Sequence, residues 1–359
     1  MVTLLAILLV TLLATLPESR SALPTILSES DQSVLTKVSV FETGRFHPIT
    51  SDIGSCSTCS PPKPLLIVRP KEDGKYPVIL FHHGTACQNS WYTDVLKFIS
   101  SHGYIVIAPQ LYRWMPPSGQ SELDMAAEVA NWLRSGLRCV LPENIEGDLH
   151  NLALAGHSRG GYIAFALALG HADVSPDINF SAVIGVDPVA GTSKKDQVEP
   201  KILNYEPCSF SLSIPVAVIG SGLGNKPVLP FLPQACAPDG VSHTEFFNEC
   251  KPPCSHFVPT DYGHMDFLDD DIGLIGSAAR LICKGSKWGV SRDPLRRTAG
   301  GVFVAFLEAF FKGNDTDYNK ILINPNYFAP ATLDPVQSKS EGTSCSSLSA
   351  MSMPAFAFE

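Results

Sequence analysis

The stretch that most constrains the fold of this chain is GHSRG at residues 156–160, which fits the pattern G-x-S-x-G. The apolar residues 152–155 before it predict a short buried strand, and residues 161–169 after it predict a helix. A serine on a tight turn between a strand and a helix is the setting of a nucleophile elbow. Gly156 and Gly160 suit that turn, because side chains there would collide with the adjacent strand and helix. The alternative is an ordinary glycine-rich turn with a surface serine.

Apolar strands alternate with helical segments along most of the chain. The expected strands are residues 65–68, 77–81, 105–108, 152–155, 182–186 and 215–219, and the expected helices are residues 90–101, 123–137, 161–169 and 300–312. Continuous apolar strands separated by helices are typical of a parallel sheet that is covered on both faces. The expected fold class is therefore α/β, with a mostly parallel, doubly wound sheet and helices on both faces.

The chain of 359 residues is expected to have four parts. Residues 2–16 are almost wholly apolar, and small residues follow at Ser19 and Ser21, so residues 1–21 are predicted to be a secretory-type leader. Residues 22–60 are expected to be an N-terminal extension with an edge strand at residues 37–42. Residues 61–330 are expected to form a single catalytic domain, because no linker interrupts their pattern. The serine-rich residues 331–359 are expected to be a disordered tail.

Composition and charge limit the classes of binding partner that this chain is expected to have. Hydrophobic residues make up 45% of the chain, enough for a large core. The formal net charge of −9 argues against nucleic acid or anionic membrane surfaces as partners. The apolar leader is short for a membrane span, and no later run has 18 uninterrupted apolar residues, so the mature chain is not expected to cross a membrane. Peripheral membrane contact and the oligomeric state stay open.

The chain has ten cysteines, some of which would pair in an oxidising compartment. Cys236 and Cys250 bracket a loop rich in proline, aspartate and glycine and are the expected pair. Cys56 with Cys59, and Cys250 with Cys254, could suggest zinc, but the second spacing is irregular and no histidine pair completes a common pattern. We therefore expect no metal site.

A serine hydroxyl needs a base to become nucleophilic near neutral pH, and the base needs an orienting carboxylate. After a nucleophile elbow the expected order along the chain is serine, acid, histidine. Asp187 is the favoured acid for Ser158, because it directly follows the apolar strand at residues 182–186. Less favoured acids lie in expected loops, namely Asp173, Asp177 and Asp196.

The favoured base is His264, which follows a short apolar segment at residues 257–258 and precedes a helical stretch. A histidine on the loop after the last strand is placed to reach over Ser158. His243 and His256 are the alternatives, within the long connection at residues 222–259. Any of the three, taken alone, is more often a solvated or core imidazole than a catalyst.

The negative oxygen of an acyl-transfer intermediate needs two backbone N–H donors. One is expected from Arg159, directly after the serine. The other is expected from Thr85, with Gly84 as the next choice, in the sequence HHGT that follows the strand at residues 77–81. His82 and His83 are interpreted as structural groups beside the elbow, because neither can be the base without inverting the chain order.

An acidic cluster follows His264 in the sequence. It lacks the alternating spacing and central glycine of a calcium loop, so it is interpreted as favourable charge at a helix start. Its members are Asp266, Asp269, Asp270 and Asp271.

Four blocks in one order resemble plant chlorophyllases: GHSRGG at 156–161, GVDPVAG at 185–191, IGSGLG at 219–224 and YGHMD at 262–266. The similarity runs over residues 65–312. It implies an α/β-hydrolase that cleaves the phytyl ester of chlorophyll to chlorophyllide and phytol. It also implies a triad of Ser158, Asp187 and His264, with no metal or organic cofactor.

Two alternative functions stay open at this point. One is a broader lipid or polyester esterase, and the other is a non-catalytic ligand-binding protein on a hydrolase scaffold. The location is open as well. The leader resembles those that direct proteins to the endoplasmic reticulum, vacuole or exterior, whereas chlorophyll as substrate implies the chloroplast.

Overall fold

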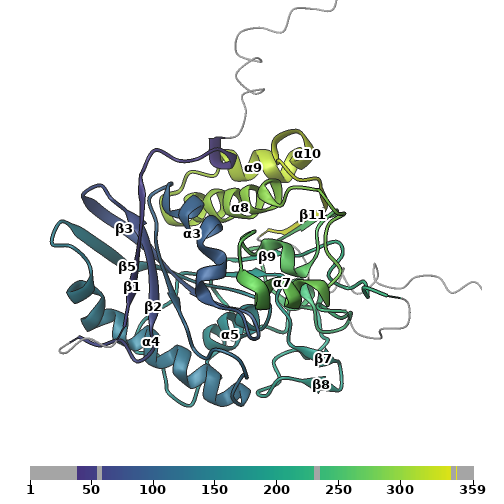
Figure 1. Cartoon of the computed structure of the whole chain (residues 1–359), viewed down its shortest axis with the longest axis horizontal. Helices are drawn as coiled ribbons and strands as arrows, with labels where there is room; N and C mark the ends of the chain where they lie inside the picture. Colours follow the sequence, from purple (N-terminus) through teal and green to yellow (C-terminus); the bar gives the residue numbers. More distant parts are fainter. Residues whose placement is uncertain (1–38, 55–58, 230–234, 341–344, 346–359) are drawn as a thin grey trace, which may run out of the picture. The chain divides into compact units, whose positions relative to one another are not determined.

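The computed structural model describes residues 39–54, 59–229, 235–340 and 345. These residues form one nine-stranded sheet in the order β1-β2-β4-β3-β5-β6-β9-β10-β11, and a separate hairpin of β7 and β8 (Figure 1). The strands are β1 (Pro48–Ile53), β2 (Leu65–Pro70), β3 (Gly74–His82), β4 (Ile105–Pro109), β5 (Ile145–His157), β6 (Ala182–Val186), β7 (Gly191–Ser193), β8 (Asp196–Gln197), β9 (Val216–Ile219), β10 (Cys254–Pro259) and β11 (Leu333–Lys339). From β4 to β10 neighbouring strands are parallel, whereas β1, β2 and β11 join by antiparallel pairing.

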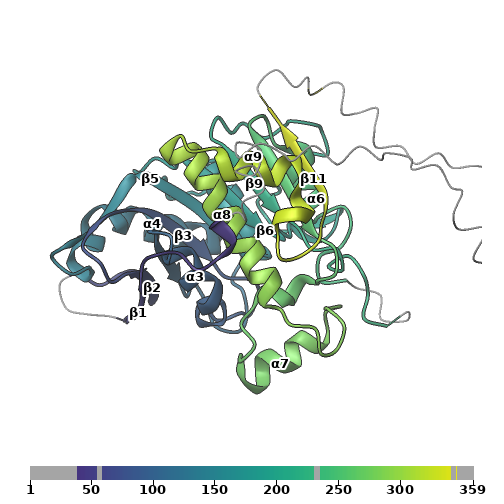
Figure 2. The same ribbon diagram turned by 90° about the horizontal axis from the view of Figure 1, so that it is seen from above.

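Helices cover both faces of this sheet, which confirms the expected α/β class (Figure 2). The α-helices are α3 (Thr93–Ser100), α4 (Gly119–Val140), α5 (Arg159–Ala168), α6 (His243–Glu249), α7 (Gly273–Leu281), α8 (Asp293–Lys312), α9 (Thr316–Ile323) and α10 (Pro325–Phe328). The short 3-10 helices are η2 (Ser39–Phe41), η3 (Asn89–Tyr92) and η4 (His264–Phe267). No helix among the described residues is long and apolar enough to cross a membrane.

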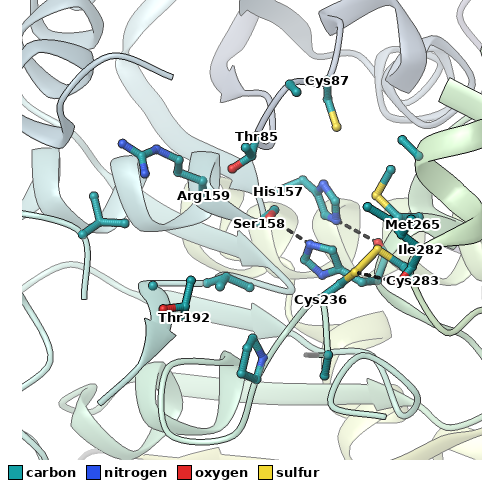
Figure 3. A pocket seen from close by; sticks show the side chains of 18 residues that line it. Thr85, Cys87, His157, Ser158, Arg159, Thr192, Cys236, Met265, Ile282 and Cys283 are labelled. Atoms are coloured by element: carbon teal, nitrogen blue, oxygen red, sulfur yellow. Dashed lines mark hydrogen bonds between the residues drawn. A yellow bond between two sulfur atoms is a disulfide. The ribbon is translucent and has the colours of Figure 1, made fainter. Parts of the chain in front are cut away.

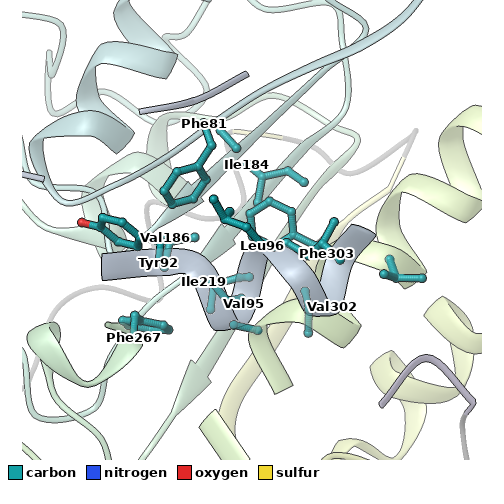
Figure 4. Close-up of a cluster of buried hydrophobic side chains, with 14 of the residues drawn as sticks. Phe81, Tyr92, Val95, Leu96, Ile184, Val186, Ile219, Phe267, Val302 and Phe303 are labelled. Atoms are coloured by element: carbon teal, nitrogen blue, oxygen red, sulfur yellow. The ribbon is translucent and has the colours of Figure 1, made fainter. Parts of the chain in front are cut away.

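Successive residues of the central strands serve opposite faces. In β3, Ile79 and Phe81 belong to the core beneath α3 and α8, whereas Val78 and Leu80 belong to the core beneath α4 and α5. Figure 4 shows the first of these cores, in which Phe81 lies near Leu96 of α3. A strand buried on both faces has to be apolar throughout, and this explains why the central strands can be predicted from the sequence.

The N-terminal boundary differs from the expectation. Residues 39–41 form the 3-10 helix η2 rather than part of an edge strand, and β1, within the expected extension, pairs with β2 in the main sheet. Val40 and Phe41 are both buried in one core, which an alternating strand would not allow. The leader predicted at residues 1–21 lies outside the described residues.

The expected disordered tail is also wrong in part, because residues 333–339 form β11 at the sheet edge. Leu333 is buried in the core, and the Lys339 ammonium donates hydrogen bonds to the backbone carbonyls of Phe247, Asn248 and Cys250. An edge strand needs only one neighbour, so a mostly polar sequence can form it without the apolar pattern of a central strand.

Candidate active site

Ser158 lies on the turn between β5 and α5, in the backbone that an elbow requires. Its φ of 58° is rare for a residue with a side chain. A Cβ added at Gly156 would lie 2.2 Å from the carbonyl oxygen of Gly160, and one added at Gly160 would lie 2.2 Å from that of His82. The two glycines are therefore required by close backbone contacts, as the sequence predicts.

Three side chains from separate strand ends meet beside this turn. His264 Nε2 lies 2.8 Å from Ser158 Oγ, and His264 Nδ1 lies 2.7 Å from Asp187 Oδ2. Their exposed fractions are 8% for Ser158, 4% for His264 and 0% for Asp187. Asp187 follows β6, and His264 begins η4 shortly after β10. These residues are up to 106 positions apart in the sequence. The parallel strands bring them together because the carboxyl ends of those strands lie side by side.

The carboxylate of Asp187 receives its hydrogen bonds at Oδ2, whereas its buried Oδ1 has no hydrogen-bond partner among the described residues. Ser221 Oγ donates to its Oδ2 at 2.5 Å, and His243 Nε2 lies 4.0 Å from its Oδ1. Burial opposes the charged form, but the hydrogen bond from His264 and the nearby imidazoles outweigh it and lower the pKa of Asp187. No motif marks Ser221 in the sequence, although its place just after β9 puts it at the same carboxyl ends of the strands.

None of the alternative acids and bases forms a hydrogen bond with Ser158. His243 and His256 hydrogen-bond each other through Nδ1 and Nε2 at 2.8 Å, and burial lowers the pKa of His256 to about 3. Neither histidine hydrogen-bonds Ser158. The alternative acids are all exposed and have no contact with the elbow, namely Asp173, Asp177 and Asp196.

The two expected oxyanion donors lie next to the serine. Arg159 is the first residue of α5, so its backbone N–H has no intrahelical acceptor. Thr85 lines the cavity in front of Ser158. The N–H of Gly84, the second choice, already donates to Tyr92 Oη at 3.0 Å. This geometry favours Thr85 over Gly84.

A buried chain of hydrogen bonds links this loop to His264. The Gly84 N–H donates to Tyr92 Oη, Tyr92 donates to His157 Nδ1 at 2.9 Å, and His157 Nε2–H donates to the carbonyl oxygen of His264 at 2.9 Å. Burial lowers the pKa of His157 to about 3, so its ring is neutral and can both accept and donate. Neither Tyr92 nor His157 was predicted from the sequence as a partner of the site.

His82 and His83 are buried, as their structural interpretation requires. Burial lowers the pKa of His82 to about 3 and that of His83 to about 4. His83 Nδ1–H donates to the Gly84 carbonyl, and its Nε2 accepts from the Leu111 N–H. Both ring nitrogens of His83 thus help to hold the Gly84 loop.

A cavity of about 460 Å³ opens in front of Ser158 (Figure 3). Its lining is mostly apolar and includes Val189, Met265, Ala279 and Ile282. A mostly apolar cavity with a few polar groups at one end suits a lipophilic ligand.

The expected disulfide between Cys236 and Cys250 is wrong. Cys236 pairs with Cys283, and both line the cavity, whereas Cys250 is a buried free thiol (Figure 3). Cys250 ends α6 inside the core, on the side of the sheet away from the cavity wall formed by α7. The composition of the loop between Cys236 and Cys250 suggests that they pair, but in the fold the two residues lie on opposite sides of the sheet.

The acidic cluster forms hydrogen bonds and ion pairs with other segments, in addition to any effect of its charge on a helix N-terminus. Asp266 accepts hydrogen bonds from the N–H groups of Gly263 and Ser286 and pairs with Arg292 at 2.8 Å. Asp270 pairs with Arg292 and Arg296, and burial raises the pKa of Asp269 to about 7. These ion pairs could not be predicted from the sequence, because Arg292 and Arg296 lie more than 20 residues after the aspartates they bind. Asp266 thereby joins the His264 loop to residues 286–292.

Within the described ranges, no group of three or more histidine, cysteine, aspartate or glutamate side chains could hold a metal ion. Cys59, whose spacing from Cys56 is one found in zinc sites, forms a disulfide with Cys139. Cys56 lies outside those ranges.

The chain resembles known proteins over most of its length. The family model for chlorophyllase matches residues 36–340. The chain is 47% identical to chlorophyllase type 0 of Chenopodium album, over 86% of this chain and 88% of that protein. It is 50% identical to the chloroplastic chlorophyllase-1 of Citrus unshiu, over 80% and 84%, and 48% identical to chlorophyllase-1 of Arabidopsis thaliana, over 77% and 84%. With its elbow, its strand-end residues and this similarity along most of its length, the chain belongs to the chlorophyllase family.

Proposed function

We propose that this protein is a carboxylic-ester hydrolase that cleaves the phytyl ester of chlorophyll and releases chlorophyllide and phytol. The observation that carries the proposal is the hydrogen-bonded line from Ser158 Oγ through His264 to Asp187, at one end of an apolar cavity. The names of the relatives supply the substrate. The apolar lining supports a substrate with a long hydrocarbon alcohol.

The proposed reaction has two halves. In the first, His264 Nε2 takes the proton of Ser158 as Oγ attacks the ester carbonyl, and the N–H groups of Arg159 and Thr85 stabilise the negative oxygen. The bond to phytol breaks, and the imidazolium protonates the leaving alkoxide. In the second, His264 takes a proton from water as the hydroxide attacks the acyl carbonyl, Ser158 Oγ leaves and regains the proton from His264, and chlorophyllide departs. Asp187 holds the imidazole in the required tautomer throughout. The chemistry uses no cofactor, and the magnesium of chlorophyll belongs to the substrate.

The proposal is tested by incubating the purified protein with chlorophyll a in detergent and separating the pigments by chromatography. We expect chlorophyllide from the native protein and a decrease in kcat of roughly 10⁴ to 10⁶-fold for Ser158→Ala. The matched control is Ser211→Ala, because Ser211 is exposed and lies outside the cavity of Ser158. Chlorophyllide formation by Ser158→Ala at near-native rate would refute the assignment.

A broader esterase is a second candidate, because an apolar cavity does not by itself select a pigment ester. Comparing kcat/KM for chlorophyll a, p-nitrophenyl esters and triglycerides separates the two functions. We expect chlorophyll to have the highest kcat/KM. Equal or higher values for triglycerides would favour the broader activity.

The compartment is part of the same proposal. Among the described residues three disulfides form, which suits the secretory route that the apolar leader indicates. The Citrus relatives named as chloroplastic support the plastid instead. We propose the secretory route, tested by the location of a fluorescent fusion of the full chain. Plastid fluorescence would overturn it.

A further inference from the structure

A continuous segment beside the cavity exposes large apolar side chains to solvent. The α7 apolar surface, as we call it, comprises Leu274, Ile275, Leu281, Ile282 and Trp288. Leu274 is 92% exposed, and Trp288 is fully exposed. Only Gly276 of α7 is buried, and α7 projects from the body of the described fold (Figure 2). Clustered exposure of this kind marks an interaction site rather than ordinary surface.

The charge of the same segment is opposite to that of the chain. Residues 272–292 contain four basic residues and no acidic residue, in a protein of net charge −9. Arg292 pairs with Asp266 and Asp270, and Arg280 donates to the backbone carbonyls of Leu268 and Asp269. Lys284 and Lys287, in contrast, are exposed and form no ion pair within the described part of the chain. The two lysines therefore flank the exposed apolar side chains with positive charge.

The α7 apolar surface is continuous with the cavity of Ser158. Ile282 belongs to both, since it is largely exposed and also lines the cavity next to Met265 (Figure 3). Ala279 and Cys283 line the cavity from the same segment. The Cys236–Cys283 disulfide and the bonds of Asp266 fix this segment at the cavity mouth.

We propose that the α7 apolar surface docks on a lipid bilayer that contains anionic headgroups. Exposed leucine, isoleucine and tryptophan side chains insert at the boundary between headgroups and acyl chains, and lysines beside them attract anionic lipid. A lipophilic ester then passes from the bilayer over Ile282 toward Ser158 without crossing water. This route rests on the proposed function, whereas docking on lipid does not.

The test is co-sedimentation of the full chain with vesicles of phosphatidylcholine, with and without phosphatidylglycerol. Leu274→Ser/Ile275→Ser/Trp288→Ser should lower vesicle affinity about tenfold or more, because three exposed apolar side chains no longer insert. Lys284→Gln/Lys287→Gln should lower affinity about fivefold per lysine, only with phosphatidylglycerol. None of these residues lines the cavity.

The matched control is Ile323→Ser/Tyr327→Ser, which removes exposed apolar side chains from α9 and α10. Figure 2 places α9 and α7 at opposite margins of the fold. This control should bind vesicles like the native protein, and every variant should hydrolyse a soluble p-nitrophenyl ester at the native rate, which reports an intact fold and site.

The outcomes separate the two proposals. Native vesicle affinity in the triple variant, or no vesicle binding by the native protein, overturns the docking surface, even where chlorophyll in detergent is cleaved. Vesicle binding that is lost in the triple variant supports the surface, even where chlorophyll is not cleaved and the proposed function fails.

Discussion

The floor and the wall of the cavity are built in different ways. The floor consists of Ser158, Asp187 and His264 with the partners that hold them, at the ends of buried parallel strands. The wall is the segment at residues 272–290, whose helix α7 buries only Gly276. The floor is held by many buried contacts, and the wall is held by the disulfide of Cys283 and by the bonds of Asp266.

The difference follows from what each region has to do. The proton transfer that we propose between Ser158 and His264 requires heavy atoms within hydrogen-bond distance, so small displacements should lower the rate strongly. Contact with an apolar ligand or a bilayer depends on area and is non-directional. We therefore expect changes in the floor to act mainly on kcat, and changes in the wall to act mainly on KM or on lipid binding.

The largest expected effect is that of Asp187→Asn. The amide would leave the His264 ring in the wrong tautomer, so kcat should decrease by about 10⁴-fold with little change in fold. The measurement is hydrolysis of a soluble p-nitrophenyl ester, with thermal unfolding as the check on the fold. Activity within a few-fold of the native value would mean that Asp187 does not orient the base.

The next effect concerns the backbone beneath the floor. Gly160→Ala places a Cβ against the His82 carbonyl and should lower the free energy of unfolding by about 3 kcal/mol. The control is Gly54→Ala, because a Cβ at Gly54 meets no atom within 4 Å. Denaturant titration measures both. Equal stability of the two variants would show that the elbow tolerates a side chain.

Tyr92→Phe tests the hydrogen-bond chain that links the Gly84 loop to His264. Removing the hydroxyl leaves Gly84 N–H and His157 Nδ1 without their partner, and kcat should decrease about tenfold at unchanged KM. The control is Tyr162→Phe, which removes a hydroxyl that hydrogen-bonds the Pro200 carbonyl, and neither Tyr162 nor Pro200 lines the cavity. If both variants lower kcat equally, Tyr92 is not a positioning residue.

The smallest effect on catalysis is expected in the wall. Cys236→Ser/Cys283→Ser frees one side of the cavity and should raise KM for chlorophyll about threefold, with kcat for a soluble ester nearly unchanged. Cys59→Ser/Cys139→Ser removes a disulfide that does not line the cavity and is the control. A large decrease in kcat in the first variant would mean that the wall also positions the floor.

The floor could be predicted from the sequence because local patterns identify its members. Ser158 is marked by two glycines between a strand and a helix, and Asp187 by its place at the end of an apolar strand. The order of residues along the chain then excluded the histidines before the serine. The central strands were predictable for the same reason, since burial on both faces leaves a continuous apolar pattern.

What the sequence left open depends on contacts between distant residues. Ser221 and Tyr92 hydrogen-bond groups 34 and 65 positions away, and no periodic pattern records such bonds. The partner of Cys236 is likewise decided by the fold, and β11 needed only one neighbouring strand. Polar residues whose partners are remote have no local signature.

The central claim is that the Ser158 hydroxyl attacks the ester, and active-site labelling tests it most directly. The native protein is titrated with an organophosphorus reagent, the modified residue is mapped by mass spectrometry, and chlorophyllide formation is measured at each step. We expect a single adduct on Ser158 and a loss of chlorophyllide formation in proportion to it. Full modification of Ser158 with undiminished chlorophyllide formation would contradict it.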